Sequence, residues 1–214
     1  SHERRFGRVG VFKLTAFHHW IKDVLDLLPL GPTTEAPGNI GDGRLWGIIL
    51  ETTLPLDWTG LSNSQMTVRV KGVDSTVVDP VTDEDRRLSG EGGFRGDLLF
   101  QNMDRYFVDF DFRQDIESAK VSWGFGFAER DRRVLYKANE LDIFGESFDV
   151  TAFIETTRWF GLKMSAEGQN LLNNLNTRDR TIYDGPRSLS PVLRQELREG
   201  QNGARILFKV VGTF

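Results

Sequence analysis

Apolar and polar residues alternate with a period of two in eight segments of this chain, and this alternation is the feature that most constrains its fold. In residues 121–128, for example, Val121, Trp123, Phe125 and Phe127 alternate with serine, glycine and alanine. Successive side chains of a strand point to opposite faces of a sheet, so each segment predicts a β-strand with one apolar face and one polar face. The predicted strands occupy residues 10–19, 46–54, 66–71, 106–113, 121–128, 148–155, 159–170 and 205–214.

The joins between these segments are short and long in turn. The short joins read DWTGLSN, QDIESAK and ETTRW, and the long joins cover about 22–43, 74–96, 129–146 and 171–192. Strict alternation of this kind predicts an up-and-down antiparallel meander of about eight strands, with all short turns and both termini at one end. We find no domain boundary and expect residues 1–214 to form a single all-β region.

Composition excludes several classes of protein. The chain has 27 basic and 31 acidic residues and a net charge of −4, so it lacks the basic surface expected of a nucleic-acid-binding protein. It has no cysteine, which excludes a disulfide framework, a thiolate zinc site and a cysteine nucleophile. No apolar run approaches the roughly eighteen residues of a transmembrane helix. The first ten residues carry no apolar signal segment, so we expect a processed chain or a fragment.

The sequence contains few residues that could carry out catalysis. There are three histidines, and the adjacent His18 and His19 would point to opposite faces of a strand and could not share a metal. Asp109 and Asp111 lie two residues apart near Arg113, which favours salt bridges over a general acid and base. No glycine-rich phosphate loop precedes a helix. We therefore expect no enzymatic activity, no metal and no cofactor.

Alternating strands have two physical explanations. In a soluble sandwich the apolar face is the core, whereas in an outer-membrane barrel it faces lipid and the polar face lines the interior. The segregation of short and long joins favours the barrel. So do aromatic residues near strand ends, where rings can lie between headgroups and hydrocarbon: Trp46, Tyr106, Trp159 and Phe214. The final alternating stretch RILFKVVGTF, which ends on a free aromatic residue, agrees with this explanation.

Three stretches resemble the carboxy-terminal hairpins of TonB-dependent outer-membrane receptors: FIETTRWFGLKMSAEGQNLLN, RDRTIYDGPRSLSP and LREGQNGARILFKVVGTF. An earlier stretch, RRFGRVGVFKLTAFHHWIKDVLDLLP, resembles one of their upward strands, so the resemblance spans nearly the whole chain. It implies localisation in the outer membrane of a Gram-negative bacterium and uptake of a siderophore, cobalamin, haem or a carbohydrate. It also implies a signal for the barrel-assembly machinery at Ile206, Phe208, Val210, Gly212 and Phe214.

The chain also departs from that family. Such transporters have about 22 strands around a plugged lumen, so roughly fourteen strands and the plug are missing. Either another chain or portion supplies them, or eight strands close into a small barrel. In both cases the polar face would line the lumen through seven basic and five acidic residues: Lys13, Glu51, Arg69, Lys71, Asp109, Asp111, Arg113, Glu155, Lys163, Glu167, Arg205 and Lys209.

Two functional alternatives remain open beside uptake. One is a small standalone outer-membrane barrel with a structural or adhesive role and no active transport. The other is a soluble all-β binding protein. For the membrane alternatives we expect outer-membrane lipid and lipopolysaccharide as partners, because basic loop residues can bridge phosphates.

Overall fold

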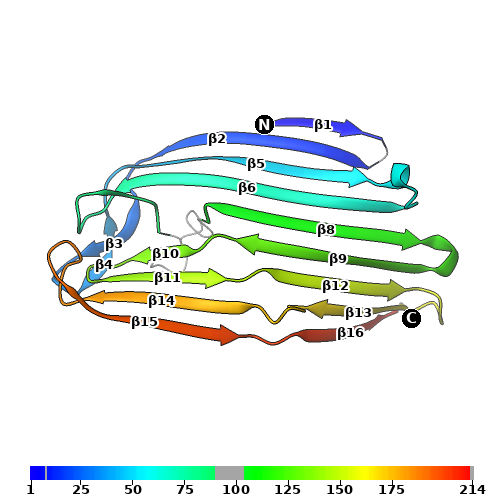
Figure 1. Ribbon diagram of the computed structural model, residues 1–214. Coiled ribbons are helices and arrows are strands. Elements are labelled where there is room, and N and C mark those ends of the chain that lie inside the picture. Colours follow the sequence, from blue (N-terminus) through cyan, green and yellow to red (C-terminus); the bar gives the residue numbers. More distant parts are fainter. Residues whose placement is uncertain (8, 90–103, 213–214) are drawn as a thin grey trace.

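The computed structural model describes residues 1–7, 9–89 and 104–212, and antiparallel β-strands form almost all of it (Figure 1). The largest sheet contains ten strands. Nine follow one another in the order β1-β2-β5-β6-β8-β9-β12-β13-β16, and β7 also pairs with β6. The predicted all-β antiparallel fold is therefore confirmed. The bounds of these strands are β1 (His2–Phe6), β2 (Gly10–Ile21), β5 (Gly43–Pro55), β6 (Ser64–Val78), β7 (Asp85–Arg86), β8 (Tyr106–Ile116), β9 (Val121–Arg130), β12 (Asp149–Thr156), β13 (Lys163–Gln169) and β16 (Arg205–Val211).

The eight predicted strands correspond to β2, β5, β6, β8, β9, β12, β13 and β16, which are neighbours in chain order. The short turns lie together at the right-hand end in Figure 1, and the long connections lie at the other end. Two of the short turns contain single 3₁₀ turns, η1 (Asp57–Thr59) and η2 (Glu117–Ala119). The prediction of an up-and-down meander with segregated turns is confirmed.

Two details of the prediction were wrong. The additional strand β1 pairs with β2, with His2 opposite Leu14, so the amino terminus lies partway along the sheet rather than at the short-turn end. Residues 159–162 form a turn instead of the start of a strand, because Phe160 and Gly161 both have positive φ angles. Trp159 therefore belongs to a turn, and β13 begins at Lys163.

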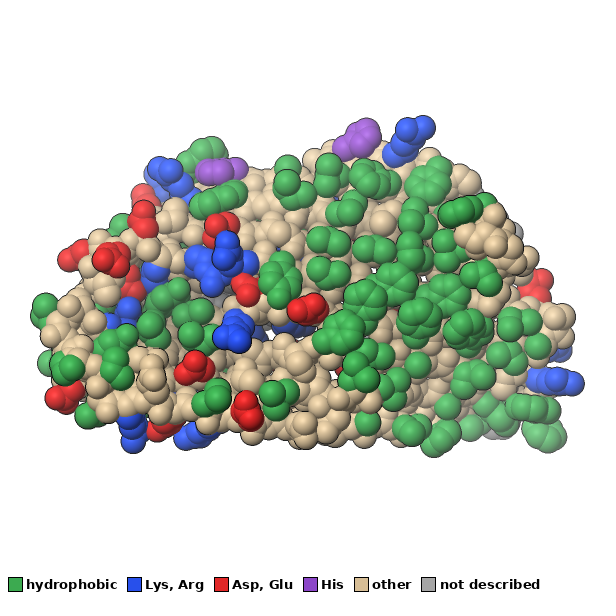
Figure 2. Space-filling view, in the orientation of Figure 1, with side chains coloured by type: hydrophobic (Ala, Val, Ile, Leu, Met, Phe, Trp, Pro, Cys, Tyr) green, Lys and Arg blue, Asp and Glu red, His purple; other side chains and the backbone are tan. Residues whose placement is uncertain are grey.

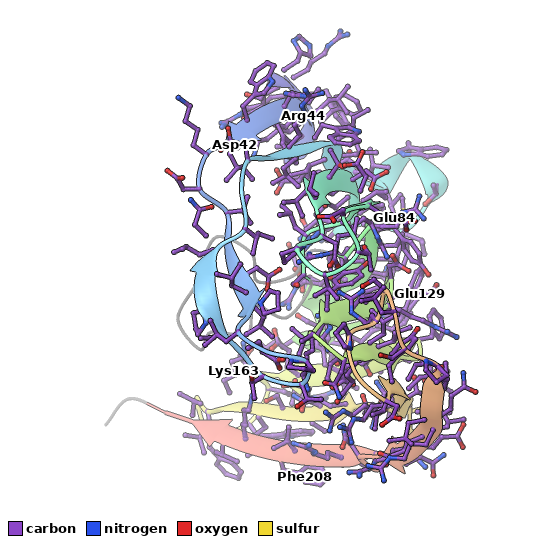
Figure 3. The ribbon with its side chains drawn as sticks, turned by 90° about the vertical axis from the view of Figure 1, so that its left-hand side faces the viewer. Asp42, Arg44, Glu84, Glu129, Lys163 and Phe208 are labelled. Carbon is purple, nitrogen blue, oxygen red and sulfur yellow. The ribbon has the colours of Figure 1, made fainter. Side chains whose placement is uncertain are left out.

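The sheet is open. β1 and β16 lie at its two ends, and among the described residues they do not pair with each other. Closure of these strands into a small barrel is therefore not observed. Instead the sheet curves into a trough, and Figure 3 shows Lys163 on its concave side and Phe208 on the opposite, convex side.

The long connections contain further strands. A four-stranded sheet in the order β10-β11-β14-β15 extends the lower half of the main sheet at the long-loop end (Figure 1). A separate two-stranded hairpin lies in the connection between β2 and β5. These strands are β10 (Arg133–Tyr136), β11 (Glu140–Glu146), β14 (Leu175–Tyr183) and β15 (Val192–Gln201), with β3 (Leu25–Pro29) and β4 (Glu35–Asn39) in the hairpin. Part of the connection predicted over residues 74–96 lies outside the described residues.

A small apolar core lies beneath the β3–β4 hairpin, which stands on the concave side of the sheet (Figure 3). Val24, Ile40, Val77 and Leu88 are buried there, and Ile21 and Leu28 pack against them. Val77 comes from the end of β6, so the hairpin closes over the long-loop end of the sheet. The rest of the concave face remains free of this cover.

Close contacts with neighbouring strands explain why a glycine, Gly124, occupies the middle of β9. A Cβ atom on Gly124 would come closest to the backbone oxygen of Phe112 on β8, and it would lie 2.5 Å from Cε1 of Phe153 on β12. Such a ring over a glycine covers backbone that has no side chain of its own. By contrast, a Cβ on Gly72 of β6 would meet no atom within 4 Å.

We predict that Gly124→Ala destabilises the fold and that Gly72→Ala, as a matched strand glycine, does not. Overfilling the contacts with the Phe112 backbone and the Phe153 ring should lower the free energy of unfolding by about 1–3 kcal/mol. Denaturant unfolding followed by circular dichroism in detergent measures both variants. Equal stability of the two variants would contradict these close contacts at Gly124.

Candidate functional site

All twelve charged residues predicted to line a lumen lie on one face of the main sheet. The cross-strand register places Lys13 opposite Glu51, Glu51 opposite Arg69, and Arg69 opposite Asp109. Alternation along each strand puts the other members on the same side: Lys71, Asp111, Arg113, Glu155, Lys163, Glu167, Arg205 and Lys209. This is the concave face, where Figure 3 shows Lys163. That the face lines a lumen stays a prediction.

Ion pairs join neighbouring strands across this face. Lys13 Nζ lies 2.6 Å from Glu51 Oε2, and Arg69 Nη2 lies 2.6 Å from Asp109 Oδ2 and 3.3 Å from Asp111 Oδ2. Further along the sheet, Glu155 accepts from both Arg113 at 2.6 Å and Lys163 at 2.8 Å, and Lys209 lies 3.2 Å from Glu167. The concave face is thus largely self-neutralised, which limits its net attraction for a charged small molecule.

The short-turn half of this face carries an open groove. One hollow of about 480 Å³ is lined by Arg113, Phe153, Glu155, Lys163, Glu167 and Lys209, among others. A second hollow of about 300 Å³ adjoins it and shares Glu155 and Lys163. Both linings combine charged groups with apolar side chains such as Phe153 and Val121.

The convex face is apolar and exposed. Figure 2 shows a broad apolar surface over the short-turn half of the molecule, with charged side chains gathered toward the long-loop end. On β5 no charged residue of this face lies between Trp46 and Leu54. The charged residues of this face on β5, β6 and β9 lie at the long-loop end: Arg44, Asp74 and Glu129. Arg4 on β1 is the exception, because it lies opposite Phe12 on this face.

Aromatic side chains mark this apolar band. Stacked or tilted ring pairs connect Phe110, Phe112, Phe125, Phe127 and Trp123 across β8 and β9, with centroids 5.0–5.8 Å apart. His18 stands at the long-loop border with its ring 4.2 Å from Trp20 and 6.1 Å from Trp46. His19 points to the opposite face and contacts Phe17, as predicted for adjacent histidines in a strand.

The residues of the predicted assembly signal occupy the last strand of the sheet. Ile206, Phe208 and Val210 pair with β13 and are exposed on the convex face, and Gly212 follows β16. Phe214 lies outside the described residues. The signal itself stays a prediction.

A buried ionic network at the long-loop end was not predicted from the sequence. Asp79 Oδ2 lies 2.7 Å from Arg187 Nη2 and 2.9 Å from Arg86 Nε. Arg86 also reaches Asp26 on β3 at 3.0 Å, and the Tyr136 ring lies 4.4 Å below its guanidinium carbon. These residues come from all four long connections, so the network ties the connections into one unit. No local sequence pattern could have found it, because Asp26 and Arg187 are far apart in the chain.

The network favours the ionised form of the Asp79 carboxyl. Burial would raise the pKa of the Asp79 carboxyl, but hydrogen bonds from Arg187 and from the Val81 amide, with the charges of Arg187 and Arg86, hold it below its ordinary value. Removing the charge of Asp79 would leave the buried Arg187 without its carboxylate partner and Arg86 with Asp26 alone.

A second set of ion pairs spans the four-stranded sheet. Arg180 donates to both oxygens of Glu140 at 2.8 Å, and Arg178 lies against the buried Asp142. The hydrogen bond from Arg180, aided by Lys137, lowers the pKa of Glu140 from 4.5 to about 2. These pairs were also missed at the sequence level, since they lie in segments interpreted as long loops.

The described residues contain no group of three or more histidine, cysteine, aspartate or glutamate side chains that could hold a metal ion. In the same parts of the chain, no helix has the length and apolar character of a membrane-spanning helix. Comparisons of the chain with protein-family models, curated proteins and solved structures found no match.

We predict that Asp79→Asn destabilises the long-loop end of the molecule. Breaking a buried ion pair on one side should lower the free energy of unfolding by about 3 kcal/mol. The exposed pair Arg5–Glu3 provides the control, because Glu3→Gln should change it by less than about 0.5 kcal/mol. Denaturant unfolding measures both, and equal effects would refute a structural role of the network.

We predict an acid-dependent loss of stability from Glu140. Its pKa is lower in the folded protein than the ordinary 4.5, so its stabilisation is fully present above that pH and is lost as the pH falls through about 2. Thermal unfolding of the protein and of Glu140→Gln between about pH 6 and pH 2 should show a difference in melting temperature that shrinks toward pH 2. A difference that is constant with pH would contradict the ion pair with Arg180.

Proposed function

We propose that this chain is the carboxy-terminal barrel region of a TonB-dependent receptor-like protein in a Gram-negative outer membrane. In this role it contributes strands, lumen wall and external loops to the uptake of a ligand such as a siderophore, cobalamin, haem or a carbohydrate. The observation that carries the proposal is the exposed apolar band on the convex face of a curved sheet whose concave face is ionic; Arg4 is the one charged residue that the described strands place within the band.

The dimensions of the band suit a bilayer. On β5 it spans nine residues, from Trp46 to Leu54, and a transmembrane β-strand needs about 9–11 tilted residues. Aromatic residues border it at both ends: Trp20, Trp46 and Tyr106 toward the long connections, and Trp58, Trp123 and Trp159 toward the short turns. Rings at the two borders of an apolar band are typical of proteins that cross a membrane with strands.

The open edges support a larger assembly over a standalone barrel. An unpaired strand edge in lipid would leave backbone N–H and C=O groups without partners, at a cost of several kcal/mol each. β1 and β16 are such edges within the described residues. Strands from another chain or portion would satisfy both edges, and a plug would meet the ionic concave face.

Single cysteines test the orientation, because the chain has no cysteine of its own. Ile154 on the convex face is 53% exposed, whereas Ser165 lines the concave groove. In protein folded into vesicles, we predict that Ile154→Cys resists a water-soluble maleimide and that Ser165→Cys reacts. In a soluble protein both cysteines would react, since Ile154 is then also in water. Fast labelling of Ile154→Cys would exclude the bilayer.

Uptake itself is tested in the native membrane. A tagged form of the chain, isolated from the outer-membrane fraction, should contain the missing strands and plug in equal stoichiometry, either on a longer polypeptide or on a partner. Deleting residues 205–214 should abolish accumulation of the transported ligand, because β16 and the predicted assembly signal are then lost. A lone 24.4 kDa monomer in the membrane would refute uptake and favour a structural or adhesive barrel.

A further inference from the structure

Four arginines gather on one face of the four-stranded sheet. Arg178 and Arg180 lie on β14, and Arg194 and Arg198 lie on β15; we call them the arginine patch. The register places Arg178 opposite Arg198, Arg180 opposite Glu196, and Ile182 opposite Arg194, so the four side chains share a face.

This face continues the convex, apolar face of the main sheet. Val150 and Phe148 lie on the convex face, and the alternation of side chains continues from them to Glu146 and Phe144 of β11. Phe144 lies opposite Arg178, so Arg178 is on the same face. Figure 2 shows charged side chains over this part of the same surface, next to the apolar band. Phe144 lies four positions before Phe148, so the patch begins about 13 Å beyond the last aromatic residue of the band.

The patch carries more positive charge than its partners neutralise. Glu196 forms ion pairs with three guanidinium groups, those of Arg180 and Arg194 at 3.0 Å and that of Arg198 at 3.6 Å. With Lys137, the patch has five positive side chains against Glu140, Asp142 and Glu196. The like charges of Arg178 and Arg198 lie directly opposite each other, which is unfavourable in a sheet unless an anion lies between them.

The acidic partners lie below the arginines rather than in front of them. Asp142 is 1% exposed at its side chain and Glu140 9%, whereas Arg194 is 60% and Arg198 65% exposed. Arg178 is also held by the Phe144 ring, 5.3 Å from its guanidinium carbon. Asp142 and Glu140 therefore hold the inner arginines in place. Arg194 and Arg198 share the single carboxylate of Glu196, and their remaining donors can bind an anion from outside.

We propose that the arginine patch binds phosphate groups of lipid headgroups at the long-loop border of the apolar band. Guanidinium groups match phosphate oxygens with paired hydrogen bonds, and several arginines at fixed spacing can hold a lipid that carries more than one phosphate. This inference rests on the proposed membrane location and adds a lipid site to it. Binding at the patch would fix the height of the sheet in the bilayer.

The test compares two vesicle compositions and two variants. Protein is folded into phosphatidylcholine vesicles with or without diphosphoryl lipid A, and lipid A retained after detergent extraction is counted by native mass spectrometry. The test variant is Arg194→Gln/Arg198→Gln, which removes two exposed charges. The control, Arg5→Gln/Arg158→Gln, removes two exposed charges at the short-turn end.

We expect wild type and the control variant to retain lipid A equally, and the test variant to bind it about tenfold more weakly, as loss of charge-assisted hydrogen bonds predicts. Arg198→Lys should give an intermediate affinity, because it keeps the charge and loses the paired geometry. Equal losses in the test and control variants would overturn the site. So would displacement of lipid A by inorganic phosphate at equal concentration, because the patch would then bind free anions.

The labelling of Ile154→Cys in the same vesicles separates the two proposals. Protection of this cysteine together with unchanged lipid A binding in the test variant overturns the lipid site alone. Rapid labelling of this cysteine overturns the membrane location and the lipid site together.

Discussion

Cross-strand register is the constraint on which the rest of this structure depends. Glu51 lies opposite both Lys13 and Arg69 on one face, while Phe112 lies opposite Phe125 on the other. A slip of one residue between any two strands would move a whole apolar set to the ionic face and place charges in the apolar band. The ion pairs and ring contacts therefore act together to hold one pairing, although each exposed pair is worth little by itself.

The two ends of the sheet are stabilised by different interactions. At the short-turn end the concave face is an open groove, and its carboxylates and cations pair across neighbouring strands. At the long-loop end, the β3–β4 hairpin covers a small apolar core and a buried network around Asp79 and Arg86. Burial of charge is costly without partners, so the network defines one arrangement of the long connections rather than simply adding stability.

The proposed membrane location explains the open edges, the apolar band and the arginine patch together. An apolar convex surface needs a low-polarity surrounding, a strand edge in that surrounding needs a partner, and a basic border meets anions most readily where headgroups begin. Arg4 on β1 does not follow the pattern of the band. It lies close to the short-turn border, where a long side chain can extend its charge toward water.

The sequence by itself determined eight strands of the main sheet, their faces and their order, because alternation and turn residues are local properties of neighbouring residues. It therefore placed all twelve charged residues of the concave face together and indicated a meander with segregated turns. The tertiary structure alone decided what depends on distant residues: the pairing of Arg86 with Asp26, the hairpin over Val77, and the register that brings Arg178 opposite Arg198. It also decided that the sheet stays open, because closure depends on curvature accumulated over many strands and not on the pattern of any one of them.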